Sequence, residues 1–212
     1  MEKQDYQKKL AAIADELLYQ IKECNDYFDA MNALNAAITL HNETIHIAAD
    51  FFSVVQFSLI DSIMVGLIKL YDKNKDSISI PKCLEKIKLL KTELIVSQSE
   101  WKSTFEALQK YEDKLGSYDK TLKYLRIRRD KYYMHNDNGF FLSGRSLRTL
   151  APFNFADTSE LLSIAKNICG IIYRVCSGKD WKPYIRQETM YEHVRDFSGL
   201  EKLIDAAEAE KQ

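Results

Sequence analysis

Two side chains near the middle of the chain, Arg129 and His135, are of types that catalyse reactions at phosphate groups. The planar guanidinium of an arginine suits a phosphate, to which it donates two parallel hydrogen bonds. The imidazole of a histidine titrates near neutral pH, so it can take up or release a proton. Two structural roles compete with this one. Arg129 can pair with a core carboxylate such as Asp61, and His135 can complement the negative end of a helix.

One helix, expected over residues 118–135, must position both side chains. Leu122, Leu125 and Arg129 follow a three-to-four-residue spacing, which places Arg129 on the stripe that the two leucines bury. Asn136 opens an Asn-Asp-Asn-Gly sequence that ends this helix, because Asn and Gly tolerate left-handed backbone.

The spacing within this helix raises a geometric question. In a continuous α-helix Arg129 and His135 diverge by roughly 120°, whereas Arg128 and His135 share a face. Three arrangements would resolve this: the helix distorts before His135, Arg129 reaches round it, or a second protomer completes the site. Arg128 also stays open as the working arginine.

The chain as a whole predicts an all-α helical bundle of about five to seven helices with a long buried central helix. Only 3 prolines and 7 glycines interrupt 212 residues, which favours long helices over many short strands. We expect the bundle to span residues 1–178, with a C-terminal helical extension over 179–212. A Ser198/Glu201 capping box is expected to start the last helix.

The remaining elements follow from helical periodicity, breakers and capping residues. The first helix is expected over residues 5–23, and 26–39 either continue it or form a second one. Residues 140–156 are expected to be a loop with a short hairpin. The other predicted helices are 81–95, one capped by Ser99 that ends before Gly116, and 159–177, capped by Asp157 or Thr158.

The central helix, expected from about Glu43 to Leu70, contains an apolar stretch long enough to cross a bilayer. Asp61 lies near its centre, and an aspartate there costs roughly 2.5–3.5 kcal/mol on membrane-insertion scales. A buried helix of a bundle is therefore the simpler interpretation, and no membrane is expected. Within such a core Asp61 needs a partner, either a motif arginine or a backbone group.

The stretch Arg129-Asp130-Lys131-Tyr132-Tyr133-Met134-His135 resembles the motif of the HEPN (higher eukaryotes and prokaryotes nucleotide-binding) superfamily. In that motif an arginine and a polar residue precede a histidine. The chain is most similar to the abortive-infection U-type branch, in which a long apolar helix ends in Leu-aromatic-Asp and a Ser-Ile/Leu-Pro-Lys helix start follows. The matching residues are Leu70-Tyr71-Asp72 and Ser79-Ile80-Pro81-Lys82. The resemblance covers roughly residues 40–175.

This resemblance implies a helical bundle that forms a homodimer, with the motif at the dimer cleft, and a metal-independent endoribonuclease. His135 would be the base that deprotonates a ribose 2′-hydroxyl, or the acid that protonates the leaving oxygen. Arg129 would neutralise charge on the phosphate, and Asp130 would orient the arginine. The product would be a 2′,3′-cyclic phosphate. Weaker candidates for substrate contact are Arg128, Lys131, Tyr132 and Asn136, and the supporting residues are Asp61 and Asp72.

Three functions stay open at this point. The first is a toxin-like or phage-defence ribonuclease acting on RNA such as tRNA, with a protein antitoxin as a further partner. The second is a HEPN domain that binds RNA or nucleotides without cutting, and the third is a helical protein-interaction module. A 2′-hydroxyl nucleophile needs no cofactor, and none is expected.

The composition and the N-terminal sequence indicate the cellular compartment and the kind of surface that the protein presents. With 30 basic and 31 acidic residues, the net charge of −1 disfavours a broad nucleic-acid-coating surface but permits a local phosphate site. The four cysteines form no CxxC pair, so reduced thiols are expected rather than a metal site. The N-terminal sequence MEKQDYQKKL has no apolar stretch, so we expect no signal peptide and a cytoplasmic location.

Overall fold

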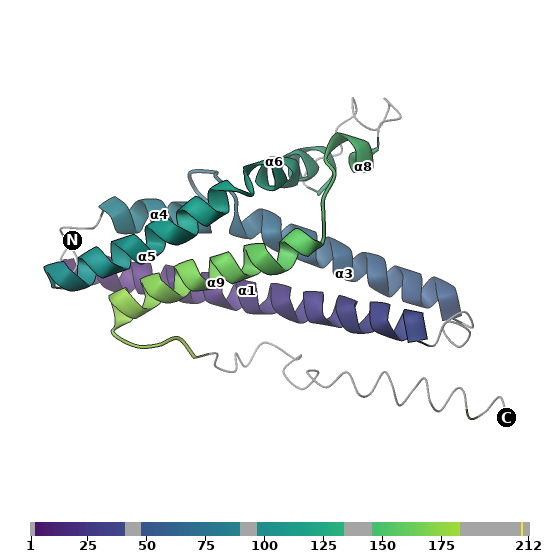
Figure 1. Ribbon diagram of the computed structural model, residues 1–212, viewed down its shortest axis with the longest axis horizontal. Coiled ribbons are helices and arrows are strands. Elements are labelled where there is room, and N and C mark those ends of the chain that lie inside the picture. The colour runs from purple at the N-terminus through teal and green to yellow at the C-terminus, as the bar shows by residue number, and fades with distance from the viewer. Residues whose placement is uncertain (1–2, 41–47, 90–96, 134–145, 183–208, 210–212) are drawn as a thin grey trace. The chain divides into compact units, whose positions relative to one another are not determined.

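The computed structural model describes residues 3–40, 48–89, 97–133, 146–182 and 209. Within these residues there are seven α-helices, one π-helical turn and no strand, so the predicted all-α class is confirmed. The elements are α1 (Lys3–Leu40), α3 (Ala49–Leu70), α4 (Ile80–Leu89), α5 (Gln98–Gly116), α6 (Asp119–Arg128), the π turn η2 (Arg129–Tyr133), α8 (Leu147–Leu150) and α9 (Ala156–Ser177). Figure 1 labels the α-helices.

The chain divides into two compact units. The first comprises residues 1–22 and 64–182, and the second comprises 23–63 and 183–212. The first unit therefore contains the whole Arg129 segment. The predicted boundary at residue 178 stays a prediction, because residues 183–208, including the expected Ser198/Glu201 cap, lie outside the described residues.

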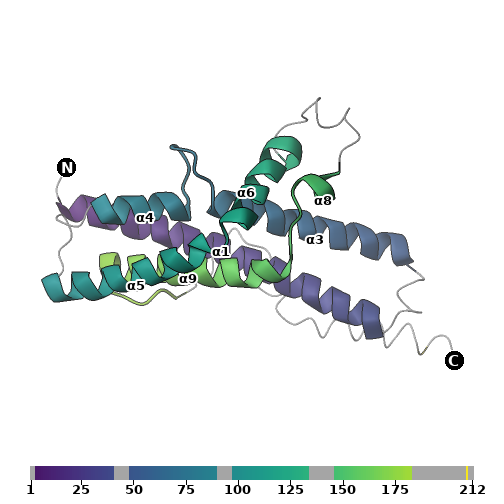
Figure 2. The ribbon, with the colours of Figure 1, turned by 45° about the horizontal axis from the view of Figure 1, so that its top comes forward.

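The core of the first unit forms where α4 and α5 pack against α9, and Figures 1 and 2 both show α5 beside α9. Helix α9 buries residues at three- and four-residue intervals, as an amphipathic core helix must: Leu161, Ile164, Ala165, Ile168 and Ile172. Each leucine or isoleucine buried this way contributes about 1.5–3 kcal/mol.

The C-terminal end of α9 is fixed to the first part of α1. Gly178 ends the helix with φ at 69°, a left-handed conformation that favours glycine. The Gln7 side chain donates to the Val175 and Cys176 carbonyls. Trp181 then donates to Asp15 at 2.7 Å.

The four cysteines are free and buried, as the reduced-thiol interpretation predicted. Burial raises the pKa of the Cys83 thiol to about 12, and that of Cys176 also to about 12. Since the thiolate is the reactive form, these thiols are inert at neutral pH. In the parts of the chain that are described, no cluster of His, Cys, Asp or Glu could hold a metal ion.

The second unit contains a helix pair formed by the end of α1 and the start of α3. The Cys24 thiol lies 3.7 Å from the Ile63 carbonyl oxygen, and the Gln56 amide donates to the Asn35 side chain at 2.8 Å. Residue numbers rise along α1 and fall along α3 from the first contact to the second, so the two helices are antiparallel here. Phe52 packs against Ala37 between them.

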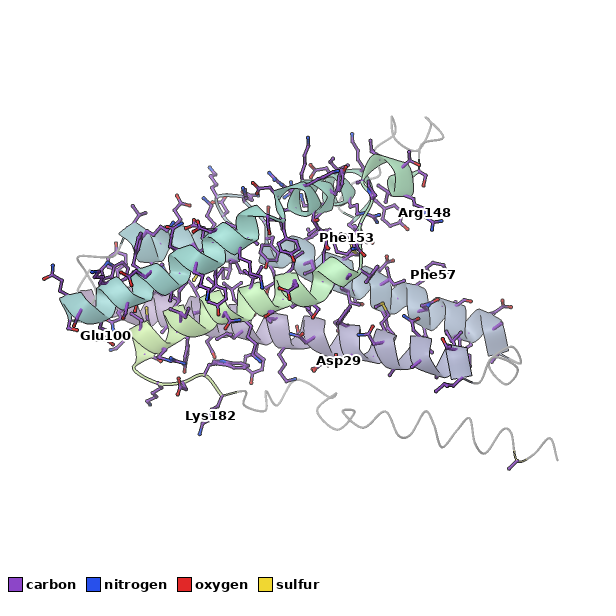
Figure 3. All side chains as sticks on the ribbon, viewed as in Figure 1. Asp29, Phe57, Glu100, Arg148, Phe153 and Lys182 are labelled. Carbon is purple, nitrogen blue, oxygen red and sulfur yellow. The ribbon has the colours of Figure 1, made fainter. Side chains whose placement is uncertain are left out.

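Helix α3 meets the length and composition of a membrane span, as some core helices of soluble proteins also do. Its final residues are buried, as predicted, with Ile63, Met64 and Leu67 fully enclosed. Its first half differs from the prediction, since Phe51, Val54 and Phe57 are 63–66% exposed. Figure 3 shows Phe57 projecting from this half. Asp61 is exposed as well, so it needs no buried partner.

Several predicted helix ends shift. Residues 3–40 form one helix rather than two, and the cap of α5 is Ser97, whose hydroxyl accepts from the Glu100 N–H, rather than Ser99. Helix α9 begins at Ala156, ahead of both expected caps, because the Asn154 side chain already accepts from the Ala156 N–H. The hairpin expected within 140–156 is absent from the described residues 146–156, which contain α8.

Candidate functional site

Arg129 lies where the backbone hydrogen bonds change from the α-helical to the π-helical pattern. Up to Arg128 the segment is an α-helix that buries Leu122 and Leu125, and from Arg129 to Tyr133 it is a π turn with no buried residue. Single π turns within helices occur frequently at functional sites. Of the three arrangements left open above, a distortion of the helix is present within the described residues, and it begins at Arg129 itself.

Two carboxylates hold the guanidinium of Arg129. Its Nη1 donates to Asp72 Oδ1 at 2.6 Å, and its Nε donates to Asp130 Oδ1 at 2.8 Å. These hydrogen bonds, that to Asp130 first, raise the pKa of Arg129 against the opposing effect of burial. The side chain is 26% exposed, so a ligand can still reach it. In the described part of the chain, these two bonds use two of its five N–H groups.

Asp72 is placed by the connector between α3 and α4. The buried Ser79 hydroxyl donates to the Asp72 carbonyl at 2.6 Å, and the Asn74 N–H donates to the Asp72 carboxylate at 3.1 Å. The preceding Tyr71 is buried, and its hydroxyl donates to the Leu161 carbonyl of α9 at 2.6 Å. The connector is thus tied to α9 on one side of Asp72 and to α4 on the other.

Sequence reasoning named Asp61 as a possible partner of the motif arginine, and because Asp61 belongs to the second unit that pairing stays a prediction. Asp72, which follows α3 and was named above as a supporting residue, contacts Arg129. Leu-Tyr-Asp and Ser-Ile-Pro-Lys, quoted above as two separate signatures, therefore contribute to one structure. Both supply hydrogen bonds that fix the position of Asp72.

Arg128, the alternative arginine, has a structural contact. Its Nε donates to the Ala151 carbonyl at 2.8 Å, at the end of α8. This bond holds α8 beside the end of α6, where Figures 1 and 2 both place it. Arg128 thus contacts the backbone of a neighbouring segment and Arg129 contacts two carboxylates, and which of the two binds a ligand stays a prediction.

The other predicted site residues divide between the described and the undescribed parts of the chain. Tyr132 is 45% exposed and stacks edge-on against Tyr133, with 5.1 Å between ring centroids. Lys131 is half-buried and Asp130 is exposed. His135 and Asn136 lie outside the described residues, so the contact between Arg129 and His135 stays a prediction.

Sequence reasoning missed Arg126. A small cavity beside the ion pair is lined by Ile68, Tyr71, Asp72, Leu122, Leu125, Arg126 and Arg129. Arg126 therefore lies next to Arg129, on the same side of α6. A signal was present in the sequence, because Lys120, Lys123, Arg126 and Arg129 recur at intervals of three.

A comparison with protein families decides the relationship. The family model described as AbiU2, a HEPN family, matches residues 3–194 of the 212. The chain belongs to the AbiU2 family of HEPN domains. Comparisons with curated proteins and with solved structures gave no match. The match extends well beyond residues 40–175, where the resemblance was seen, and it includes the whole of α1.

Proposed function

We propose that this HEPN domain is a metal-independent endoribonuclease with a toxin-like or phage-defence role. The observation that carries the proposal is the pair of carboxylates on Arg129, within a chain of this family. Asp72 and Asp130 engage Nη1 and Nε, which fixes the plane of the guanidinium. The remaining N–H groups then have a defined direction in which to meet a phosphate.

The reaction is a transesterification within RNA. A ribose 2′-hydroxyl loses its proton to a base and attacks the adjacent phosphorus. The bond to the 5′-oxygen of the next nucleotide breaks, and that oxygen gains a proton from an acid. The products are a 2′,3′-cyclic phosphate and a free 5′-hydroxyl. His135 serves as the base or the acid, and Arg129 neutralises the charge that develops on the phosphate oxygens.

The proposal includes a homodimer, in which two His135 side chains divide the acid and base roles. It also includes a cytoplasmic location, tRNA as a substrate, and a protein antitoxin that keeps the activity in check.

The test is cleavage of total tRNA by purified protein in EDTA, with cyclic-phosphate ends detected on the products. Wild type should cleave, and His135→Ala and Arg129→Ala should each lose at least about a hundredfold in rate. Arg174→Ala is the matched control, because it removes an exposed arginine of α9 and should cleave like wild type. Cleavage that persists in His135→Ala, or no cleavage by wild type, would refute the proposal.

A further inference from the structure

Four cations form one row along α6 and its π turn. Lys120, Lys123, Arg126 and Arg129 are three residues apart, and neighbours at this spacing on a helix lie about 5–6 Å apart between Cβ atoms. The row turns by roughly 60° at each step. It therefore winds from the exposed side of the helix towards the Arg129 carboxylate pair.

The side chains of the row become more buried from Lys120 to Arg129. Lys120 and Lys123 are exposed, whereas Arg126 and Arg129 are partly buried beside the small cavity at Asp72. The described ion pairs of the first unit that lie away from Arg129 use Lys82, Lys88, Lys114 and Arg174. None of these described ion pairs involves the row; Arg126 Nε donates to the Leu122 carbonyl of its own helix at 3.3 Å, and Lys120 lies over the Tyr124 ring.

The row is unfavourable for the helix itself. Like charges at this spacing destabilise a helix by about 0.2–0.5 kcal/mol per pair. Lys120 also stands in the first turn of α6, where the positive end of the helix dipole disfavours a cation. Folding accounts for Arg126, which stands in the last turn where the helix dipole favours a cation, and for Arg129, which two carboxylates hold. It gives no reason for Lys120 and Lys123, whereas binding a polyanion does.

We propose that Lys120, Lys123 and Arg126 bind successive phosphates of a single RNA strand and lead it to Arg129. This rests on the proposed function and names its substrate class as single-stranded RNA. A single strand leaves its bases free to stack beside its phosphates, whereas a duplex keeps its bases paired. Tyr124 lies beside the row, half-exposed and 5.9 Å from Lys120 Nζ, and it offers an unpaired base a ring on which to stack.

The experiment measures binding separately from cleavage. A fluorescent single-stranded RNA with 2′-O-methyl groups, which cannot be cleaved by transesterification, is titrated with protein in EDTA at several salt concentrations. Lys120→Ala/Lys123→Ala should bind on the order of tenfold more weakly than wild type. The slope of log K against log salt should fall by about 1.4, or about 0.7 for each lost phosphate contact.

The matched control is Lys110→Ala/Lys166→Ala, which removes the same charge from exposed positions on α5 and α9. It should bind like wild type. Equal weakening in both double variants, or a duplex of the same sequence binding as tightly as the single strand, would overturn the proposal. If only Lys120→Ala/Lys123→Ala binds RNA more weakly and wild type does not cleave tRNA, the RNA-binding row is supported and the proposed ribonuclease activity is refuted. If wild type cleaves tRNA and both double variants bind RNA as tightly as wild type, the ribonuclease activity is supported and the RNA-binding row is refuted.

Discussion

The two parts of residues 119–133 are held in place by different forces. Helix α6 is anchored by apolar burial, since Leu122 and Leu125 are 6% and 2% exposed. The π turn that follows buries no residue, and the partners of Arg129 there are two carboxylates. Apolar packing thus fixes where the helix lies, while hydrogen bonds fix which way the arginine points. Substitutions should therefore be able to lower the stability of the fold and to change the direction of the Arg129 side chain separately. Four measurements test this.

The largest effect on stability should come from the apolar part. Leu125→Ala removes a fully buried side chain, and such changes cost about 2–5 kcal/mol in the free energy of unfolding. Urea denaturation measures it. Ile127→Ala, on the half-exposed side of the same helix, is the control and should cost clearly less. Equal losses in the two variants would mean that packing does not anchor α6.

Asp72→Ala should affect orientation more than stability. The ion pair is partly exposed, so its loss should lower the free energy of unfolding by only about 1 kcal/mol. If the proposed function holds, kcat should fall tenfold or more while KM changes little, because Arg129 is no longer aligned. Asp72→Asn keeps an acceptor oxygen and should recover part of the rate.

The control for Asp72 is Asp76→Ala, which removes an exposed carboxylate from the same connector. It should leave both the rate and the stability unchanged. If the rate of Asp72→Ala falls only in proportion to the fraction of protein that is unfolded, Asp72 does not position Arg129.

Ser79→Ala should have a smaller effect on stability. Its buried hydroxyl donates to the Asp72 carbonyl, and removing such a bond costs about 1 kcal/mol or slightly less. Ser103 makes the same kind of bond, to the Glu100 carbonyl, on an exposed surface. Ser103→Ala should therefore stay within about 0.5 kcal/mol of wild type by urea denaturation. The reverse order would show that the connector is not held by Ser79.

The smallest effect should come from the exposed ion pair of Lys114 with Glu160. The hydrogen bond to Glu160 raises the pKa of Lys114, so any stabilisation exists at neutral pH and is lost as pH rises through that pKa. Solvent screens the pair, and Lys114→Ala should leave Tm at pH 7 within error of wild type. A clear drop in Tm would show that this surface contact matters to the fold.

The sequence predicted what depends on local periodicity. The spacing of Leu122, Leu125 and Arg129 placed the arginine on the buried side of its helix, and Gly116 and Gly178 marked helix ends correctly. It did not predict the Asp72–Arg129 pair. That contact joins residues 57 positions apart, and no local pattern separates Asp72 from Asp61 as the partner.

Other differences arose because neighbouring groups compete for the same role. Ser97 and Ser99 are both good caps, and only the position of the chain decides between them. The exposure of Phe51 and Phe57 was missed because an apolar sequence indicates burial without showing which side is covered. The π turn has no sequence signature of its own, although a distorted helix was one of the three arrangements that the spacing of Arg129 and His135 left open.

The π turn also sets how far the motif tolerates a change in length. A π-helical turn contains one residue more than the α-helical turn it replaces. Deleting one residue between Asp130 and Tyr133 would let α6 continue as an ordinary α-helix. Each residue beyond the deletion would then keep nearly the same direction relative to Leu125, because the π turn accommodates its extra residue within a single turn. In an unbroken α-helix the same deletion would rotate those residues by about 100°, so the π turn protects the direction of the later part of the motif against a deletion of one codon.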